Sequence, residues 1–343
     1  MTENNLLLVR GLLLADGYTR SAIQHRVDSG QWSRVFRGLY LADEPDPHVA
    51  MIGRHAVVLA RGGASAALSH DTAAIHHGFD STQGFDSLST YVTVDHATQS
   101  FRLGGSGASQ FPLVVKRTRH LPPAETLVVD EFGRRFTGRV RTLLDLASRL
   151  SLHEFAVALE SGLRGPDPKR PDCWRKGVLE ELVAMVKARP RQPGAIAARI
   201  VLTQRTWTRP TGSIADTAVL LALKAAGVVD VVVQPRIIAP DHRGQVRVHF
   251  ADLLIPSGQL IIEIDGAFHD LPGRRKLDFE RDRRLTPGFH LFRYPASVAL
   301  FETQRIVAEV RAHLGASVDA GQQWQTRDRR VEGSDDNWSI TRC

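Results

Sequence analysis

Three acidic side chains interrupt two apolar runs in the segment FADLLIPSGQLIIEIDGAFH, residues 250–269. Asp252 precedes the run LLI, whereas Glu263 and Asp265 follow the run LII. Between the runs lies PSGQ, which contains Ser-Gly, a dipeptide that is typical of turns. The segment therefore predicts a β-hairpin whose two apolar strands carry carboxylates towards the same end.

The register of this hairpin brings the carboxylates together. Counting back from a turn at Ser-Gly places Asp252 opposite Glu263, with Cβ atoms roughly 5 Å apart. Because side chains alternate along a strand, Asp265 lies on the same face as Glu263. Like charges in such positions destabilise a sheet, and a divalent cation bound by their oxygens relieves the repulsion. We therefore predict a Mg²⁺ (or Mn²⁺) site. The alternatives are a different register, or an exposed rim where the basic residues 274–276 pair with the acids.

The elements around the hairpin predict a sheet with helices packed on it. Ser213 is a candidate N-cap for the first of these helices, and Gly227 follows its end. The expected elements are a helix at 212–227, strands at 229–238, 246–255 and 259–265, a charged helix at 273–288, a strand at 289–295 and a helix at 296–314. The fold class is therefore α/β (α+β), with the order α-β-β-β-α-β-α in this region.

The hairpin and the following segment DFERDRRLTPGFHLFRYP resemble the PD-(D/E)XK nuclease superfamily, in the branch related to very-short-patch mismatch repair endonucleases. The matching marks are an Asp, Glu-x-Asp-Gly eleven residues later, a His, an Asp/Arg-rich helix and a G-[FW]-x-[VL]-x-R-[FY] strand. The resemblance covers about residues 210–314. It implies a restriction-endonuclease-like αβββαβ core and metal-dependent hydrolysis of DNA.

The resemblance also implies roles for individual side chains. The implied catalytic set is Asp252, Glu263, Asp265, His269 and Arg281. The implied metal ligands are Asp252 and Glu263, joined by Asp216 from the first helix. Asp265 stands where the superfamily usually carries a catalytic Lys, so His269 would serve as the base, or a metal-bound water would lose its proton unaided. A structural His269, and an Arg281 that pairs with Asp278 on an exposed helix, are the alternatives.

Residues 1–45 predict a winged helix-turn-helix: a helix at 6–15, a second helix capped by Thr19, and a hairpin bent at Gly38. The expected DNA contacts are Arg20, Gln24, Arg26, Arg34 and Arg37. The stretch GYTRSAIQHRVDSGQWSRVFRGLYLA resembles the N-terminal domain of abortive-infection type IV antitoxins. A protein-contact module is the alternative.

Residues 48–165 predict a mixed α/β middle domain, with helical sequence at 53–78, two strands and a helical pair. Its stretches LSHDTAAIHHG and VRTLLDLA resemble the domain that follows the winged helix in those antitoxins, which implies a bacterial defence or regulatory setting with a toxin or defence-system partner. The spacing of Arg141 and Asp145 predicts a buried i,i+4 pair. Residues 166–209 are expected to form a linker and short helices, 210–314 the nuclease-like domain, and 315–343 a disordered tail.

The composition and the net charge limit the classes of function that the chain can have. A net charge of +7 over 343 residues favours a polyanionic partner. Two widely separated cysteines predict no disulfide framework, and the chain shows no signal peptide and no run of roughly 18 apolar residues, so we expect a cytoplasmic protein without a membrane. The expected function is a Mg²⁺-dependent DNA endonuclease in bacterial defence or DNA repair, targeted by the winged helix. The alternative is a non-cutting DNA-binding regulator, or type IV antitoxin-like protein, with a degenerate nuclease fold.

Overall fold

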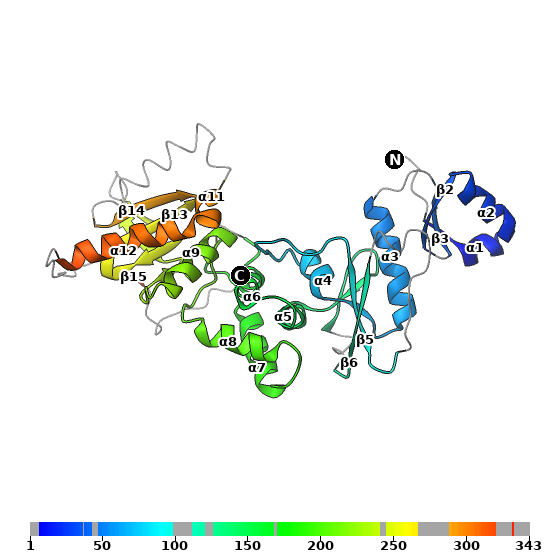
Figure 1. The fold of residues 1–343 in the computed structure, drawn as a ribbon, viewed down its shortest axis with the longest axis horizontal. Helices are drawn as coiled ribbons and strands as arrows, with labels where there is room; N and C mark the ends of the chain where they lie inside the picture. Colours follow the sequence, from blue (N-terminus) through cyan, green and yellow to red (C-terminus); the bar gives the residue numbers. More distant parts are fainter. Residues whose placement is uncertain are drawn as a thin grey trace. The chain divides into compact units, whose positions relative to one another are not determined.

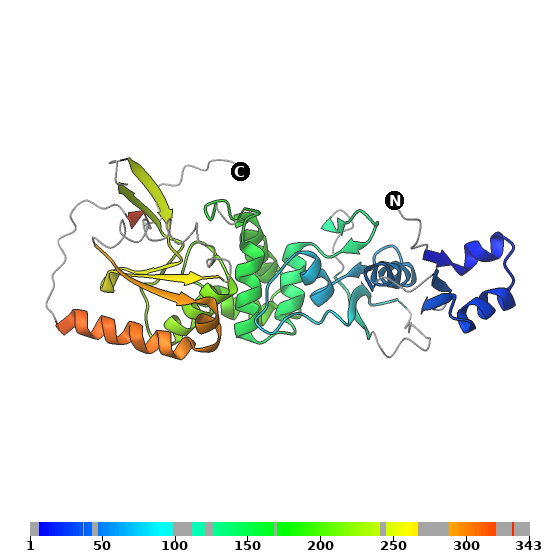
Figure 2. The same ribbon diagram turned by 90° about the horizontal axis from the view of Figure 1, so that it is seen from above.

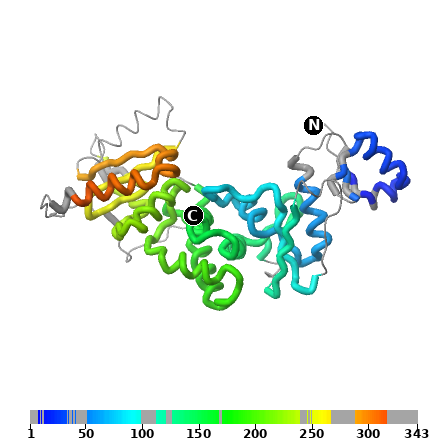
Figure 3. Tube along the Cα trace, viewed as in Figure 1, coloured from blue at the N-terminus to red at the C-terminus, as the bar shows by residue number. Residues whose placement is uncertain are grey.

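The structure, a computed structural model, is mixed α/β (Figure 1). It describes residues 7–36, 38–42, 47–98, 112–120, 126–167, 170–240, 245–266, 288–319 and 331–332. Arg37, His269 and Arg281 therefore lie outside the described residues. The chain divides into two compact units, one of residues 1–79 and 84–146 and the other of 80–83 and 147–343 (Figure 3).

The first unit begins with two helices and a hairpin. Its elements are β1 (Leu7–Val9), α1 (Arg10–Ala15), α2 (Arg20–Asp28), β2 (Trp32–Phe36) and β3 (Leu39–Ala42). The hydroxyl of Thr19 accepts the N–H of Ala22, so the expected cap of α2 is confirmed. The helix expected at 6–15 is wrong in its first half, because β1 pairs with β3 and extends the hairpin to three strands.

The rest of the first unit surrounds a five-stranded sheet of order β6-β5-β4-β8-β7. Its elements are α3 (Pro47–Gly62), β4 (Ala67–Leu68), α4 (His70–His76), β5 (Thr90–Asp95), β6 (Leu113–Thr118), β7 (Val128–Val129), β8 (Arg135–Phe136) and α5 (Arg139–Ala147). The short strand β4 interrupts the helical sequence expected at 53–78. The buried Arg141–Asp145 pair is confirmed, with Nε 2.8 Å from Oδ1.

The second unit carries a four-stranded sheet of order β14-β13-β12-β9 and a smaller sheet of order β11-β10-β15. The helices are α6 (Leu152–Leu163), α7 (Lys176–Ala188), α8 (Ala195–Gln204), α9 (Ile214–Ala225), α11 (Ala296–Phe301) and α12 (Thr303–Asp319). The strands are β9 (Val232–Val233), β10 (Arg236–Pro240), β11 (Val246–Phe250), β12 (Leu253–Ile255), β13 (Leu260–Asp265), β14 (His290–Pro295) and β15 (Val331–Glu332). The charged helix expected at 273–288 lies almost entirely outside the described residues, as does most of the expected tail.

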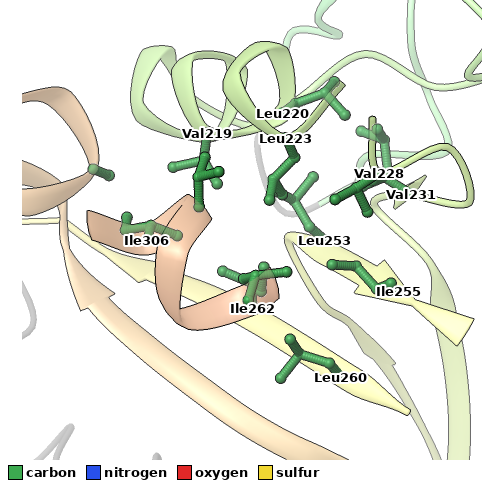
Figure 4. Close-up of a cluster of buried hydrophobic side chains, with 14 of the residues drawn as sticks. Val219, Leu220, Leu223, Val228, Val231, Leu253, Ile255, Leu260, Ile262 and Ile306 are labelled. Atoms are coloured by element: carbon green, nitrogen blue, oxygen red, sulfur yellow. The ribbon is translucent and has the colours of Figure 1, made fainter. Parts of the chain in front are cut away.

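Helices α9, α11 and α12 cover one face of the four-stranded sheet (Figures 1 and 2). Leu260 and Ile262 of β13 point into this helix-side core, where Val219 and Leu223 of α9 meet them (Figure 4). The intervening Ile261 belongs to a second, smaller core on the opposite face. Because side chains alternate along a strand, Glu263 and Asp265 share the face of Ile261 and point away from the helices.

The strands expected at 229–238 and 246–255 are each wrong as single strands. Each segment bends, and the two bends lie side by side. The first breaks at Gln234-Pro235, where Gln234 adopts a left-handed φ of 49° and Pro235 has no N–H to donate. The second breaks at Ala251-Asp252. Two backbone bonds join the bends, from the Gln234 N–H to the Asp252 carbonyl at 3.0 Å and from the Ala251 N–H to the Pro235 carbonyl at 3.3 Å. The segments before and after the bends therefore enter different sheets.

Smaller differences concern the closing helix and a cysteine. The helix expected at 296–314 is interrupted at Glu302 and continues to Asp319. Cys173 is disulfide-bonded, which the two widely separated cysteines did not predict. None of the helices in the described segments has the length and apolar character that crossing a bilayer demands.

A buried histidine in the first unit makes stability depend on pH. His55 of α3 is 4% exposed, and its Nδ1 lies 3.2 Å from Nη1 of Arg134. Burial, followed by the neighbouring Arg134 charge, lowers the pKa of His55 from 6.5 to about 3. Between these values the unfolded chain binds a proton that the folded chain does not, so stability decreases as the pH falls.

We expect the free energy of unfolding to fall by about 1.4 kcal/mol for each pH unit below about 6.5 on account of His55. The variant His55→Gln should show a smaller loss between about pH 6.5 and about pH 5 than the parent protein, measured by calorimetric unfolding. His96→Gln, which changes a histidine whose side chain is 55% exposed, is the control and should unfold as the parent does. An unchanged pH dependence in His55→Gln would contradict the assignment.

Candidate active site

The three residue pairs of the β12–β13 hairpin follow the predicted register, whereas the expected pair of Asp252 and Glu263 lies beyond the last paired residues. Leu253 lies opposite Ile262, and the pairing continues to the turn. Beyond Leu253 the backbone ladder ends, and the N–H of Ile264 donates instead to Oδ2 of Asp252 at 2.7 Å. In a continued register Ile264 would face Ala251, so the carboxylate of Asp252 takes the place of a backbone carbonyl at the bend. Asp252 is thus held against β13, one residue beyond Glu263.

The structure places the three expected hairpin carboxylates at one end of the β12–β13 pair. Glu263 is only 5% exposed, although it carries an ionisable carboxyl group. Asp252 and Asp265 are half-buried. Burial of a carboxylate is unfavourable unless hydrogen bonds or charges compensate it. This end of the sheet is therefore polar where both strands are otherwise apolar.

The neighbouring strand brings a cation to the same face. β13 and β14 are parallel, and Arg293 lies beside Glu263 in the register. Phe292 and Tyr294 point into the helix-side core, so Arg293 points the opposite way, with the carboxylates. Its Nε lies 3.6 Å from Oδ2 of Asp265. In the sequence, Arg293 is a letter of the G-[FW]-x-[VL]-x-R-[FY] motif, and the alternation of FHLFRYP could have placed it on this face.

Gln234 is a second residue that the sequence analysis missed. Its side chain is 6% exposed, with Nε2 3.4 Å from Oδ1 of Asp252, and its carbonyl accepts from Nη1 of Arg209 at 2.8 Å. A left-handed φ in a non-glycine residue costs on the order of 1–3 kcal/mol and persists only where the surroundings enforce it. The only sequence signal was the Gln-Pro dipeptide inside an apolar run.

Asp216, the third expected metal ligand, has a structural role in α9. Its Oδ2 accepts the N–H of Ser213 at 2.9 Å and its Oδ1 accepts the hydroxyl at 2.6 Å, while Ser213 caps the N–H of Asp216. Burial raises the pKa of Asp216, and the hydrogen bonds from Ser213 and the nearby charge of Arg164 only partly offset this. Both oxygens therefore accept hydrogen bonds within a capping box, and the expected role of Asp216 as a ligand stays a prediction.

The side chains of Asp216 and Gln234 both lie close to the backbone of Gly212. A Cβ atom at this position would lie 2.8 Å from Nε2 of Gln234 and 3.0 Å from Oδ2 of Asp216. Only glycine therefore leaves both polar groups where they are. Through Gln234, the start of α9 is linked to Asp252 at the bend of the sheet.

The hairpin carboxylates fit a divalent cation in chemical kind, since Mg²⁺ prefers oxygen ligands and is commonly held by one or two carboxylates plus water and phosphate. Asp252 and Glu263 supply such a pair, one of them buried. Within the described segments, no group of three or more His, Cys, Asp or Glu side chains is arranged to hold a metal ion. The fit is therefore to an open site that a substrate phosphate would complete, rather than to a closed protein cage.

The expected DNA-contact residues of the first unit lie on α2 and the adjoining hairpin. Arg20, Gln24 and Arg34 are exposed, and Nη2 of Arg34 donates to Oε1 of Gln24 at 2.8 Å. Arg26 is half-buried, with its guanidinium carbon 5.0 Å from the ring centre of Tyr18. The structure thus brings Gln24 of α2 and Arg34 of β2 into contact and gives Arg26 an aromatic contact.

No protein-family model matches the chain, and no curated protein matches it either. The nuclease-like and antitoxin-like interpretations therefore remain predictions from the motifs of the sequence.

The packing around Gly212 yields a test of the link between α9 and the bend. Gly212→Ala should lower the free energy of unfolding by about 1–3 kcal/mol, because the new methyl group must displace the Gln234 amide or the Asp216 carboxylate. Denaturant unfolding measures the change. Gly177→Ala on α7, where an added Cβ meets nothing within 4 Å, is the matched control and should cost nothing. Equal midpoints for Gly212→Ala and the parent would show that the contact is not tight.

Proposed function

We propose that this chain is a Mg²⁺-dependent (or Mn²⁺-dependent) DNA endonuclease, directed to DNA by a winged helix at its N-terminus. The observation that carries the proposal is the buried Glu263 beside Asp252 and Asp265, at the polar end of an otherwise apolar hairpin. The resemblance of this hairpin to PD-(D/E)XK nucleases points to the same chemistry. A setting in bacterial defence or DNA repair follows from that resemblance alone.

Each described side chain has a distinct task in the proposed reaction. Asp252 and Glu263 would hold the cation, which when bound supplies an activated water and stabilises negative charge on the phosphodiester. The N–H of Ile264 orients the Asp252 carboxylate, and the Gln234 amide contacts its other oxygen. Asp265 stands where the superfamily has a lysine, so it assists by charge rather than as a base. His269 and Arg281 remain the candidates for proton transfer and phosphate contact.

The purified protein should nick supercoiled plasmid DNA with Mg²⁺ or Mn²⁺ and lose this activity with a chelator. Glu263→Gln should lower the rate at least about 100-fold, the size expected when one group that stabilises transition-state charge is lost. Asp252→Asn should do the same while keeping a carbonyl oxygen for the Ile264 N–H, so the bend survives. Gel electrophoresis of the plasmid measures the rates.

Glu302→Gln serves as the matched control, because it removes one carboxylate that is 54% exposed between α11 and α12. Its nicking rate should equal that of the parent. A plasmid left intact by the parent protein with both metals would sink the endonuclease proposal, as would unimpaired nicking by Glu263→Gln.

A non-cutting DNA-binding regulator is the second candidate. The contact between the exposed side chains of Arg34 and Gln24 favours it, since basic and amide side chains on a helix and its adjoining hairpin suit a DNA groove and its phosphates. The antitoxin-like sequence of this region adds a toxin or another defence-system protein as a partner. Asp265 in place of lysine is compatible with a nuclease fold that no longer cuts.

DNA binding by the first unit has its own test. Arg20→Ala should weaken binding to duplex DNA and reduce the slope of log affinity against log salt by about one, because one phosphate contact is lost. Fluorescence anisotropy over a series of salt concentrations measures the slope. Arg199→Ala on α8 removes an exposed arginine elsewhere and should leave the slope unchanged. Equal slopes for both variants would remove Arg20 from the interface.

A further inference from the structure

The carboxylate end of the hairpin also carries a positive charge, that of Arg293. Arg293 is fixed by the parallel pairing of β14 with β13, which sets it beside Glu263. Its side chain is 27% exposed, although the Nε atom of the guanidinium is buried. Asp265, whose carboxylate lies 3.6 Å from Nε of Arg293, is 28% exposed. The pair thus lies at the opening of the polar face rather than beneath it.

We propose that Arg293 is the phosphate-binding residue of this site, receiving the DNA phosphodiester next to the cation held by Asp252 and Glu263. This inference rests on the proposed endonuclease function and deepens it. A guanidinium forms two parallel hydrogen bonds with a phosphate, and the Arg293 side chain lies near Asp265 at the strand end where that phosphate would arrive.

The charges on this face favour such a role. The three hairpin carboxylates together with Arg293 carry a formal charge of minus two among the described residues, which one divalent cation neutralises. With the cation present, the four side chains and the metal sum to zero, so an incoming phosphate meets no net negative charge when Arg293 exchanges Asp265 for it.

The test compares Arg293→Gln, Arg293→Lys and a control, Arg305→Gln. Arg305 lies on α12, on the helix-covered side of the sheet, and its side chain is 59% exposed, so its substitution makes the same change in net charge away from the carboxylates. Three quantities are measured: plasmid nicking with Mn²⁺, duplex affinity against salt with Ca²⁺ in place of the catalytic metal, and the heat of Mn²⁺ binding.

Arg293→Gln should reduce nicking about 100-fold and the salt slope by about one, with Mn²⁺ affinity unchanged or increased. Arg293→Lys should keep the slope, because the charge remains, and still lose most of the rate, because a lysine cannot bind bidentately. Arg305→Gln should match the parent in all three measurements. If Arg293→Gln does not fold, Arg293→Lys tests the proposal alone. A parental salt slope with a reduced nicking rate supports phosphate binding by Arg293, and a parental nicking rate overturns it.

The outcomes separate this inference from the proposed function. Nicking and DNA binding at parental levels in Arg293→Gln would overturn the role of Arg293 and leave the endonuclease proposal standing. If the parent protein does not nick DNA, the endonuclease proposal fails. The salt slope then still tests whether Arg293 contacts a phosphate. A slope reduced only in Arg293→Gln supports a phosphate contact without cleavage, and an unchanged slope overturns it.

Discussion

The hydrogen bond from the Ile264 N–H to the carboxylate of Asp252 joins the fold to the candidate site. A buried N–H that finds no acceptor costs free energy comparable to a lost hydrogen bond, so the bend in the strands requires a substitute for the missing carbonyl. Asp252 supplies it. The same requirement fixes the carboxylate next to Glu263 before any ligand arrives. The site is therefore preorganised by a structural demand of the sheet, and the acid cannot move without cost to the fold.

The bend itself depends on residues whose effect is not local. Gln234 has a left-handed backbone only because Arg209 holds its carbonyl and Asp252 holds its N–H. Neither partner is near it in the sequence. The start of α9 contributes through Gly212, which has no side chain to push the Gln234 amide away. A tertiary network thus maintains the strained residue, which is common where a backbone must present functional groups.

The difference between local contacts and contacts of distant segments explains what the sequence could predict. The hairpin register and the cap at Thr19 follow from neighbours within a few residues, and both are confirmed. The paired bends at Gln234 and Asp252 escaped prediction because β-branched runs favour continuous strands, whereas the bend is set by contacts between distant segments. The strand β1 was missed because the apolar run at 6–15 has no period that separates strand from helix. The position of Arg293 beside Glu263 required the parallel register of β14, which a list of elements does not contain.

The aspartate at 265 does not by itself argue against catalysis, because the electrostatic effect of a charge depends on where it lies and not on the strand that carries it. Adjacent strands are roughly 4.8 Å apart, so an arginine on β14 reaches a phosphate beside β13 about as well as a lysine on β13 would. Asp265 then has a consistent purpose, since a carboxylate at the strand end orients the guanidinium. A guanidinium stays protonated at any physiological pH and therefore cannot act as the general base. The proton from the attacking water must then pass to another group or to solvent, which separates phosphate binding from proton transfer in this site.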